Sequence, residues 1–269
     1  MEKSGAPDLI TRFNLIENLL MRFFGGKDLK LKELALCYLY FQGKTDPEKA
    51  ESLLLLTRSG MTVLLDSSYY IKKEGVMEIT EEGKRRARKI LKKVNTDLLE
   101  EEDMKGNRME HVLEKLVFLS LGKKSFSEEK AGELIIFSDI ALRRLRKTFF
   151  SRQGPGLPGL CVFFYIYIFG ALSANELTAY IPQRHVTAIH AILRNSSKEG
   201  YTEDITKEGV PRKAVLAEKG EKILLDAIEE ASRAFKAFIK DEKGKEICDC
   251  IVKLNDITHV IMRRERGGA

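Results

Sequence analysis

The chain has 269 residues, enough for one large domain or two of ordinary size. Hydrophobic residues make up 43% and charged residues 32%, a balance that can bury a core and excludes general disorder. The formal net charge of +6 is a weak indication of an anionic partner such as nucleic acid when it is spread over this length.

Three features of the chain bear on location and metal chemistry. Residues 1–8 carry charge and no apolar stretch, so we expect no secretory signal and a cytoplasmic protein. The most hydrophobic run, 160–172, is too short to cross a bilayer. The cysteines form no Cys-x-x-Cys pair, and Cys248 and Cys250 lack the spaced His or Cys partners of a zinc site. We expect no metal and no cofactor.

Apolar residues in the first half of the chain have mostly helical spacing. Asp46 followed by Pro47 is typical of a first helical turn, and Gly43 and Gly75 are typical of helix ends. A short extended stretch, 76–79, interrupts the helical pattern. The other predicted helices cover residues 8–24, 31–43, 59–75, 81–102 and 108–121.

The second half repeats this order. Ser173 is a predicted helix cap, Gly200 a predicted helix end, and residues 201–216 a strand–loop–strand segment. The predicted helices cover residues 135–152, 159–170, 174–181, 184–200, 218–241 and 245–264.

Short matching segments support an internal repeat. The segment YLYFQG ends at Gly43 and YIYIFG ends at Gly170, while TEEG and AEKG place Gly83 and Gly220 in equivalent positions. The second copy carries extra residues before Gly220, which favours a longer ribbon there. We therefore predict a first unit over 1–121, a linker over 122–133 and a second unit over 134–269.

Helices, a glycine stop, a two-stranded ribbon and a further helix together describe a winged helix-turn-helix. A helix about 10–12 Å wide fits the DNA major groove, and a basic ribbon lies along phosphates. The sequence therefore predicts a mainly α protein with small β-wings. It would hold two tandem winged helix-turn-helix units joined by a helical layer like that of a dimer interface.

Polar and basic side chains of the second copy are the main candidates for DNA contact, while Ile189, Ile192 and Leu193 are predicted to face inward. The candidates are Arg184, His185, Thr187, His190, Arg194 and Lys198 on the reading helix, with Lys207, Arg212 and Lys213 on the ribbon.

The first copy is expected to bind DNA poorly, or to bind something else. It offers Arg58 and Thr62, but Asp66 would oppose phosphate. Only eight residues separate Gly75 from Gly83, which predicts that this copy has no wing tip.

Two further patterns allow alternatives. Seven of the ten residues 84–93 are basic; phosphate contact is one interpretation, and a solvated helix balanced by the acidic 100–103 is favoured. Aromatic residues of the hydrophobic run could line a ligand pocket, although core packing is favoured. These are Phe163, Phe164, Tyr165 and Tyr167.

An enzyme is not expected. The segment 154–159 lacks the Lys and the preceding strand of a phosphate loop, and no Ser-His-Asp or metallohydrolase spacing occurs.

The second copy resembles the multiple-antibiotic-resistance regulator (MarR) family. The resemblance rests on Ser173 with the following Asn-Glu-Leu, on residues 184–203 and on residues 212–224. The family's acidic-Arg-Arg wing motif appears only as Val-Pro-Arg-Lys at 210–213, so Arg212 is the best match to its wing arginine. The resemblance implies sequence-specific binding of double-stranded DNA, transcriptional regulation and small aromatic effectors.

Members of that family are homodimers held by their terminal helices. Here two copies lie in one chain, so the hypothesis is a covalent pseudo-dimer, either monomeric or further dimerised. The alternative function is a protein–protein adaptor built on winged helices, which the missing first wing and the pair Tyr69 and Tyr70 favour.

Overall fold

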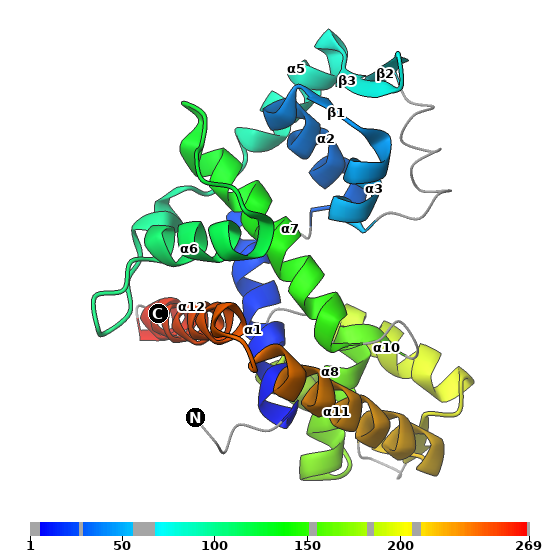
Figure 1. Ribbon diagram of the computed structural model, residues 1–269. Helices are drawn as coiled ribbons and strands as arrows, with labels where there is room; N and C mark the ends of the chain where they lie inside the picture. The colour runs from blue at the N-terminus through cyan, green and yellow to red at the C-terminus, as the bar shows by residue number, and fades with distance from the viewer. Residues whose placement is uncertain are drawn as a thin grey trace. The chain divides into compact units, whose positions relative to one another are not determined.

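The computed structural model describes residues 6–26, 29–55, 68–150, 155–181, 186–205 and 211–267 (Figure 1). The described part is mainly helical with small antiparallel sheets, as predicted. Within it, no helix combines the length and the hydrophobicity that a bilayer-crossing segment requires.

The chain divides into two compact units. Unit 1 comprises Met1–Asn18 and Arg146–Asp241, and unit 2 comprises Leu19–Leu145 and Glu242–Ala269. Each unit therefore combines segments that are far apart in sequence. The predicted boundaries at 121 and 134 describe the repeat rather than these units, and they stay a prediction.

In unit 2, a small sheet lies among three helices (Figure 1). Its strands pair in the antiparallel order β1-β3-β2. Asp46 caps α3 as predicted, because its carboxylate accepts hydrogen bonds from the amides of Glu48 (2.7 Å) and Lys49 (3.2 Å). The elements are α2 (Leu31–Gln42), β1 (Lys44–Thr45), α3 (Pro47–Leu54), β2 (Tyr70–Lys73), β3 (Val76–Ile79) and α5 (Glu81–Leu91).

The prediction of a helix up to Gly75 is wrong for the described residues 68–75. Tyr70–Lys73 forms strand β2 and pairs with β3. Glu74 and Gly75 connect the strands with φ of 50° and 81°, and two positive φ values suit the twist of a two-residue hairpin. The first copy thus has a short hairpin where the sequence predicted no wing tip. Residues 59–67 lie outside the described ranges.

The helix predicted over 81–102 is also shorter than expected. It ends at Leu91, and only the short 3-10 helix η1 (Asp97–Glu100) follows. The amide of Asn95 donates a hydrogen bond to the carbonyl of Phe23 (2.7 Å), a tertiary contact that a continued helix would not allow. Further on, α6 (Met109–Leu121) packs against α12 (Glu242–Gly267).

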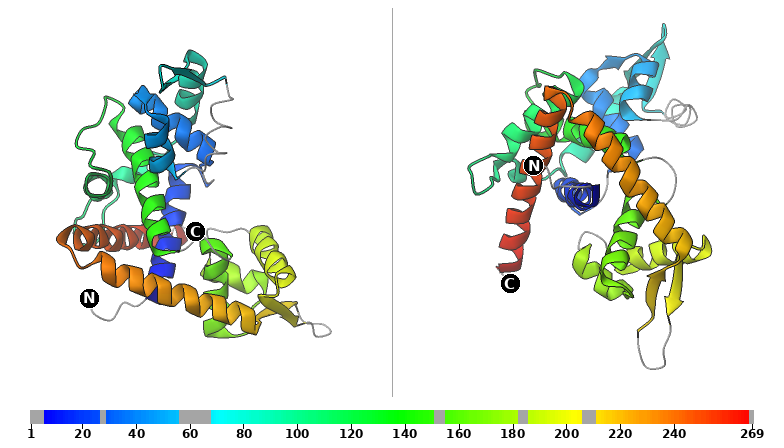
Figure 2. Two further views of the ribbon diagram at one scale, coloured as in Figure 1. Left: turned by 45° about the vertical axis from the view of Figure 1, so that its right-hand side comes forward. Right: turned by 60° about the horizontal axis from the view of Figure 1, so that its bottom comes forward.

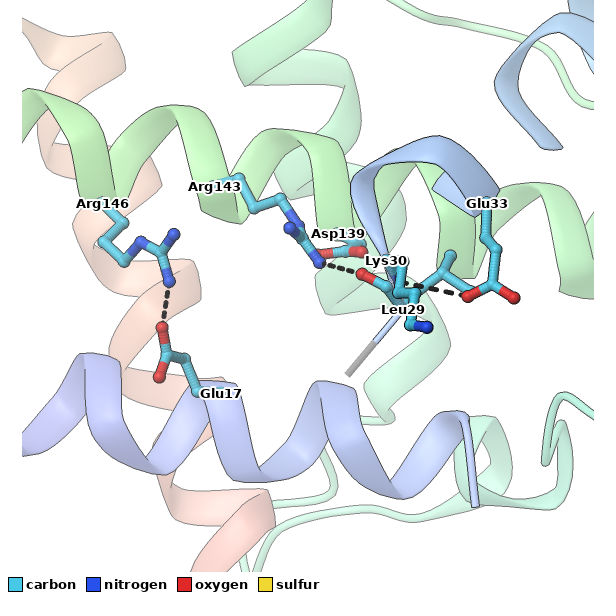
Figure 3. Close-up of polar contacts among 7 residues, drawn as sticks. All are labelled: Glu17, Leu29, Lys30, Glu33, Asp139, Arg143 and Arg146. Carbon is cyan, nitrogen blue, oxygen red and sulfur yellow. Dashed lines mark hydrogen bonds and ion pairs between the residues drawn. The ribbon is translucent and has the colours of Figure 1, made fainter. Parts of the chain in front are cut away.

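The long helix α7 (Lys130–Phe149) carries polar contacts within each unit (Figure 3). In unit 2, Arg143 donates to the buried carboxylate of Asp139 (2.7 Å) and to the carbonyl of Leu29 (2.9 Å), which lies just before α2. A buried carboxylate needs such pairing. In unit 1, Arg146 pairs with Glu17 of α1 (Ala6–Phe23).

Unit 1 has the predicted order of elements. Its hairpin of β4 and β5 lies between α10 and α11 (Figure 2). Leu172 forms an antiparallel bridge with Ala214 of β5, so the bridge, β5 and β4 follow the same order as β1, β3 and β2. The elements are α8 (Gly156–Phe169), α9 (Ala174–Tyr180), α10 (Val186–Lys198), β4 (Thr202–Ile205), β5 (Lys213–Leu216) and α11 (Glu218–Phe238).

One local contact recurs in both copies. In unit 1 the amide of Ala217 donates to the carbonyl of Tyr201 (3.0 Å), and a Cβ at Gly220 would lie 2.0 Å from that oxygen. In unit 2 the amide of Thr80 donates to the carbonyl of Tyr69 (2.9 Å). A Cβ at Gly83 would lie 2.6 Å from that oxygen. The repeated glycine is therefore required by a close approach of helix and hairpin.

Replacing Gly220 should test this contact. We expect Gly220→Ala to lower the free energy of unfolding by about 1–3 kcal/mol, because a backbone carbonyl cannot rotate away from the new methyl group. Urea unfolding measures the change. The control is Gly132→Ala in α7, where a Cβ would meet Leu91 at an ordinary 3.5 Å. Equal stability of the two variants would contradict the proposed clash.

Candidate functional site

Four of the predicted DNA-contacting residues lie on one exposed stripe of α10. Thr187, His190, Arg194 and Lys198 follow one another at intervals of three and four residues, which places them on one helix face. All four are exposed. Ile189 is fully buried, as predicted for the inward face. Ile192 and Leu193 are only half-buried, so that part of the prediction is met incompletely.

The α10 stripe and the hairpin of unit 1 line a common hollow of about 470 Å³. Arg212, Lys213 and Asp204 form its hairpin side. The structure thus brings six predicted residues together, four from the stripe and two from the hairpin. The remaining candidates lie outside the described residues: Arg184, His185, Lys207, Arg58 and Thr62.

Both hairpin cations of this hollow are paired with carboxylates. Arg212 forms an ion pair with Asp204 on the opposite strand, and this hydrogen bond raises the pKa of Arg212. The Nζ atom of Lys213 lies 2.8 Å from a carboxylate oxygen of Glu176. Sequence reasoning assigned these two cations to DNA contact and named no partner within the protein. It missed their partners, which come from another strand and another helix.

Glu176 joins the start of α9 to β5. Its carboxylate accepts hydrogen bonds from Lys213 and from the amide of Ser173 (2.7 Å), and its own amide donates to the Ser173 hydroxyl (3.2 Å). The reciprocal bonds with Ser173 are a capping box, and they confirm the predicted cap. The Lys213 contact and then the Ser173 amide lower the pKa of Glu176 to about 2.

Arg194 and Lys198 differ from the hairpin cations. Neither forms an ion pair with any of the described residues. Helix α10 contains no Asp or Glu that could neutralise them. The stripe therefore presents unneutralised positive charge beside the polar side chains of Thr187 and His190.

The aromatic residues of α8 divide into a buried and an exposed group. Phe163 and Phe164 are buried, in agreement with the core interpretation. Tyr167 is 48% exposed, so that interpretation is wrong for it. Tyr180 of α9 stacks on Tyr165 and Phe169, with ring centroids 5.2 Å and 4.7 Å apart.

The cysteine pair of α12 does not form part of a metal site in the described residues, where no group of three or more His, Cys, Asp or Glu side chains is placed to hold an ion. Cys248 and Cys250 are both buried. Burial raises the pKa of the Cys250 thiol to about 11, which disfavours the thiolate that a metal requires.

Comparison with known proteins returns no family: no family model matches the sequence, and no curated protein matches it significantly.

The Glu176 contact predicts an acid-dependent loss of stability. Because the folded-state pKa of about 2 lies below the ordinary 4.5, the carboxylate stabilises unit 1 above pH 4.5 and loses that effect as the pH falls toward 2. The difference in free energy of unfolding between wild type and Glu176→Gln should therefore shrink from pH 6 to pH 2, measured by urea unfolding.

The matched variant for this experiment is Lys213→Met. It removes the largest cause of the shift, so the pKa of Glu176 measured by NMR should rise toward its ordinary value. A stability difference that is independent of pH would contradict the predicted role of the carboxylate.

Proposed function

We propose that the protein binds double-stranded DNA sequence-specifically through α10 and the hairpin β4–β5, as a transcriptional regulator resembling the MarR family. The order of elements supports this proposal. Each unit has a helix, a short strand or bridge, a second helix and an antiparallel hairpin whose returning strand lies in the middle. That order is the one expected of a winged helix-turn-helix, with α10 as the reading helix of unit 1.

The observation that carries the proposal is the exposed α10 stripe with its unneutralised cations. Reading helices use their first exposed residues for base edges. Thr187 and His190 would therefore contact bases, and a Thr can use both its hydroxyl and its methyl group. Arg194 and Lys198, further along the helix, would contact phosphates, for which Arg offers several donors and Lys a point charge.

Arg212 and Lys213 of the hairpin would also contact DNA, by exchanging their carboxylate partners for phosphates. An exposed ion pair contributes only about 0–1 kcal/mol. Arg212, whose side chain is 68% exposed, can therefore leave Asp204 for a phosphate at small cost. Lys213 is held by a carboxylate that also caps α9, so it contributes less readily.

Two copies in one chain would supply the two half-site readers that a homodimer supplies elsewhere. The protein would then act as a covalent pseudo-dimer, monomeric or further dimerised, and a small aromatic effector remains part of the hypothesis. The hairpin of unit 2 strengthens the case for a second reader, because β2 carries the exposed residues Lys72 and Lys73. No chemical reaction is proposed.

A second candidate function is a protein–protein adaptor. The observation that favours it is the exposed aromatic surface at the end of α8 and on α9. Tyr167, Ile168 and Phe169 are each about half exposed, and Phe169 stacks on Tyr180. Exposed aromatic groups of this kind are enriched at protein interfaces.

Duplex DNA binding is the decisive test. A pool of randomised duplexes would be selected on the full chain, and affinities measured by fluorescence anisotropy at several salt concentrations. Arg194→Gln/Lys198→Gln should weaken binding to all sequences and reduce the slope of log K against log salt by about 1.8, since each lost phosphate contact accounts for about 0.9. Thr187→Ala or His190→Ala should instead change the preferred sequence.

The control for charge is Lys236→Gln/Lys240→Gln, which removes one exposed lysine in the last turn of α11 and one just after its end. It should leave the salt slope unchanged. If the wild-type chain binds no duplex at low salt, or if all variants change binding equally, the DNA proposal fails and the adaptor is favoured.

Substitution of Asp204 is expected to strengthen DNA binding rather than weaken it. We expect Asp204→Asn to tighten DNA binding roughly two- to fivefold, because it releases Arg212 from its ion pair. The same anisotropy titration measures the gain. The change should disappear in the double variant Asp204→Asn/Arg212→Gln, whereas weaker binding of the single variant would argue against phosphate contact by Arg212.

A further inference from the structure

The basic run 84–93 forms an exposed cationic stripe on α5 of unit 2. Arg85, Lys89 and Lys92 are exposed, and their spacing of four and three residues places them on one face of the helix. The opposite face is buried through Gly83, Ala87 and Ile90. We call these three cations the α5 stripe.

Three other cations of the run have partners. Lys84 pairs with Glu81 (2.6 Å), and Arg86 lies 3.9 Å from Glu33. Arg88 donates to the hydroxyl of Tyr40 (3.1 Å), with its guanidinium 5.6 Å from the centre of that ring. The Arg86 and Arg88 contacts reach α2, whereas the Lys84 pair lies within α5. By contrast, the α5 stripe makes no ion pair with any described residue.

Three of the four residues of the acidic segment 100–103, which the sequence suggested as balancing this charge, have other partners. Glu100 pairs with Arg108 (3.3 Å), and Glu101 pairs with Arg264 of α12. Asp103 accepts hydrogen bonds from the amides of Lys105 (2.8 Å) and Asn107 (2.9 Å). The positive charge of the α5 stripe therefore keeps its attraction for an external anion.

We propose that the α5 stripe is a second, sequence-independent contact for the phosphodiester backbone of double-stranded DNA. This inference rests on the proposed function and adds a surface in unit 2 to the α10 stripe of unit 1. Arg85 and Lys92 are seven residues apart, or about 10 Å along the helix axis. One DNA strand advances about 3.4 Å per phosphate, so the length of the α5 stripe covers about three phosphate steps, enough for each of its cations to contact a different phosphate.

The chemistry of α5 favours DNA over two other anionic partners, a membrane surface and an acidic peptide. A membrane-surface helix needs an apolar face to insert, but Ala87 and Ile90 are buried in the packing of α5 against α2. Among the described residues next to it in sequence, the α5 stripe also has no exposed apolar side chain on which an acidic peptide could anchor. It contains only long cations, which suit phosphates and read no base sequence.

The test uses the full chain carrying Arg85→Gln/Lys89→Gln/Lys92→Gln. The probe is a duplex of arbitrary sequence, titrated by anisotropy over a range of KCl concentrations. We expect the slope of log K against log salt to fall by about 2.7, which corresponds to three lost phosphate contacts. The affinity should fall by the same factor for every duplex, because the contact is to the backbone.

Two matched variants separate charge at this place from charge in general. Lys236→Gln/Lys240→Gln/Lys243→Gln removes three exposed lysines elsewhere and should keep the wild-type slope. Arg85→Lys/Lys89→Arg/Lys92→Arg keeps the charge of the α5 stripe and should keep the slope as well. Circular dichroism of each variant verifies that helix content is retained.

The two proposals fail separately. If the α5 variant keeps the wild-type slope while Arg194→Gln/Lys198→Gln loses it, the α5 inference is overturned and the proposed reading helix stands. If the slope of log K against log salt falls only for the α5 variant and not for Arg194→Gln/Lys198→Gln, the α5 contact stands and the proposed role of α10 fails. If the α5 variant binds duplex normally but loses binding to anionic phosphatidylserine vesicles or to polyglutamate, the α5 stripe serves a membrane or an acidic protein instead.

Discussion

Each hairpin is followed by a helix whose first turn lies against the residue just before the hairpin. At the point of contact the helix has a glycine, because the Cβ of any other residue would meet a backbone oxygen. Gly220 lies against the carbonyl of Tyr201, and Gly83 against that of Tyr69. The neighbouring amide donates to the same carbonyl, which fixes the direction in which the hairpin leaves the helix. Because β5 is held in this way, Ala214 can pair with Leu172 and Lys213 can reach Glu176. The candidate site of unit 1 depends on this contact.

Pairing, rather than the number of charges, distinguishes the basic residues of this chain. Arg212 and Lys213 lie in the candidate site, but carboxylates already hold them. Arg194 and Lys198 on α10 and the α5 stripe make no ion pair with described residues. The net charge of +6 does not distinguish the paired cations from the unpaired ones. Long-range attraction for a polyanion comes from unpaired cations, while the paired ones organise the fold until a phosphate replaces their partners.

Errors in the sequence-based predictions occur where contacts outside the segment, rather than its own apolar spacing, decide the local structure. The pattern around Tyr70 favoured a helix, yet its pairing with β3 makes it a strand. Helix α5 was expected to continue, yet the chain turns at Asn95 toward the carbonyl of Phe23. Tyr167 belongs to a run so apolar that burial was expected along all of it, but it lies near the end of α8, beyond the core. None of these outcomes follows from the spacing of apolar residues within the segment itself.

The amino-acid sequence by itself determined the mainly helical content, most helix boundaries, the caps at Asp46 and Ser173, and the equivalent glycines at 83 and 220. These depend on periodicity and on hydrogen bonds that span only a few residues. Tertiary structure alone decided which cations of the candidate site are neutralised. The partner of Lys213 is 37 residues away, and Glu101 finds its partner 163 residues away. Such pairs form only after the chain has folded, because an ion pair depends on distance in space and not on order along the chain.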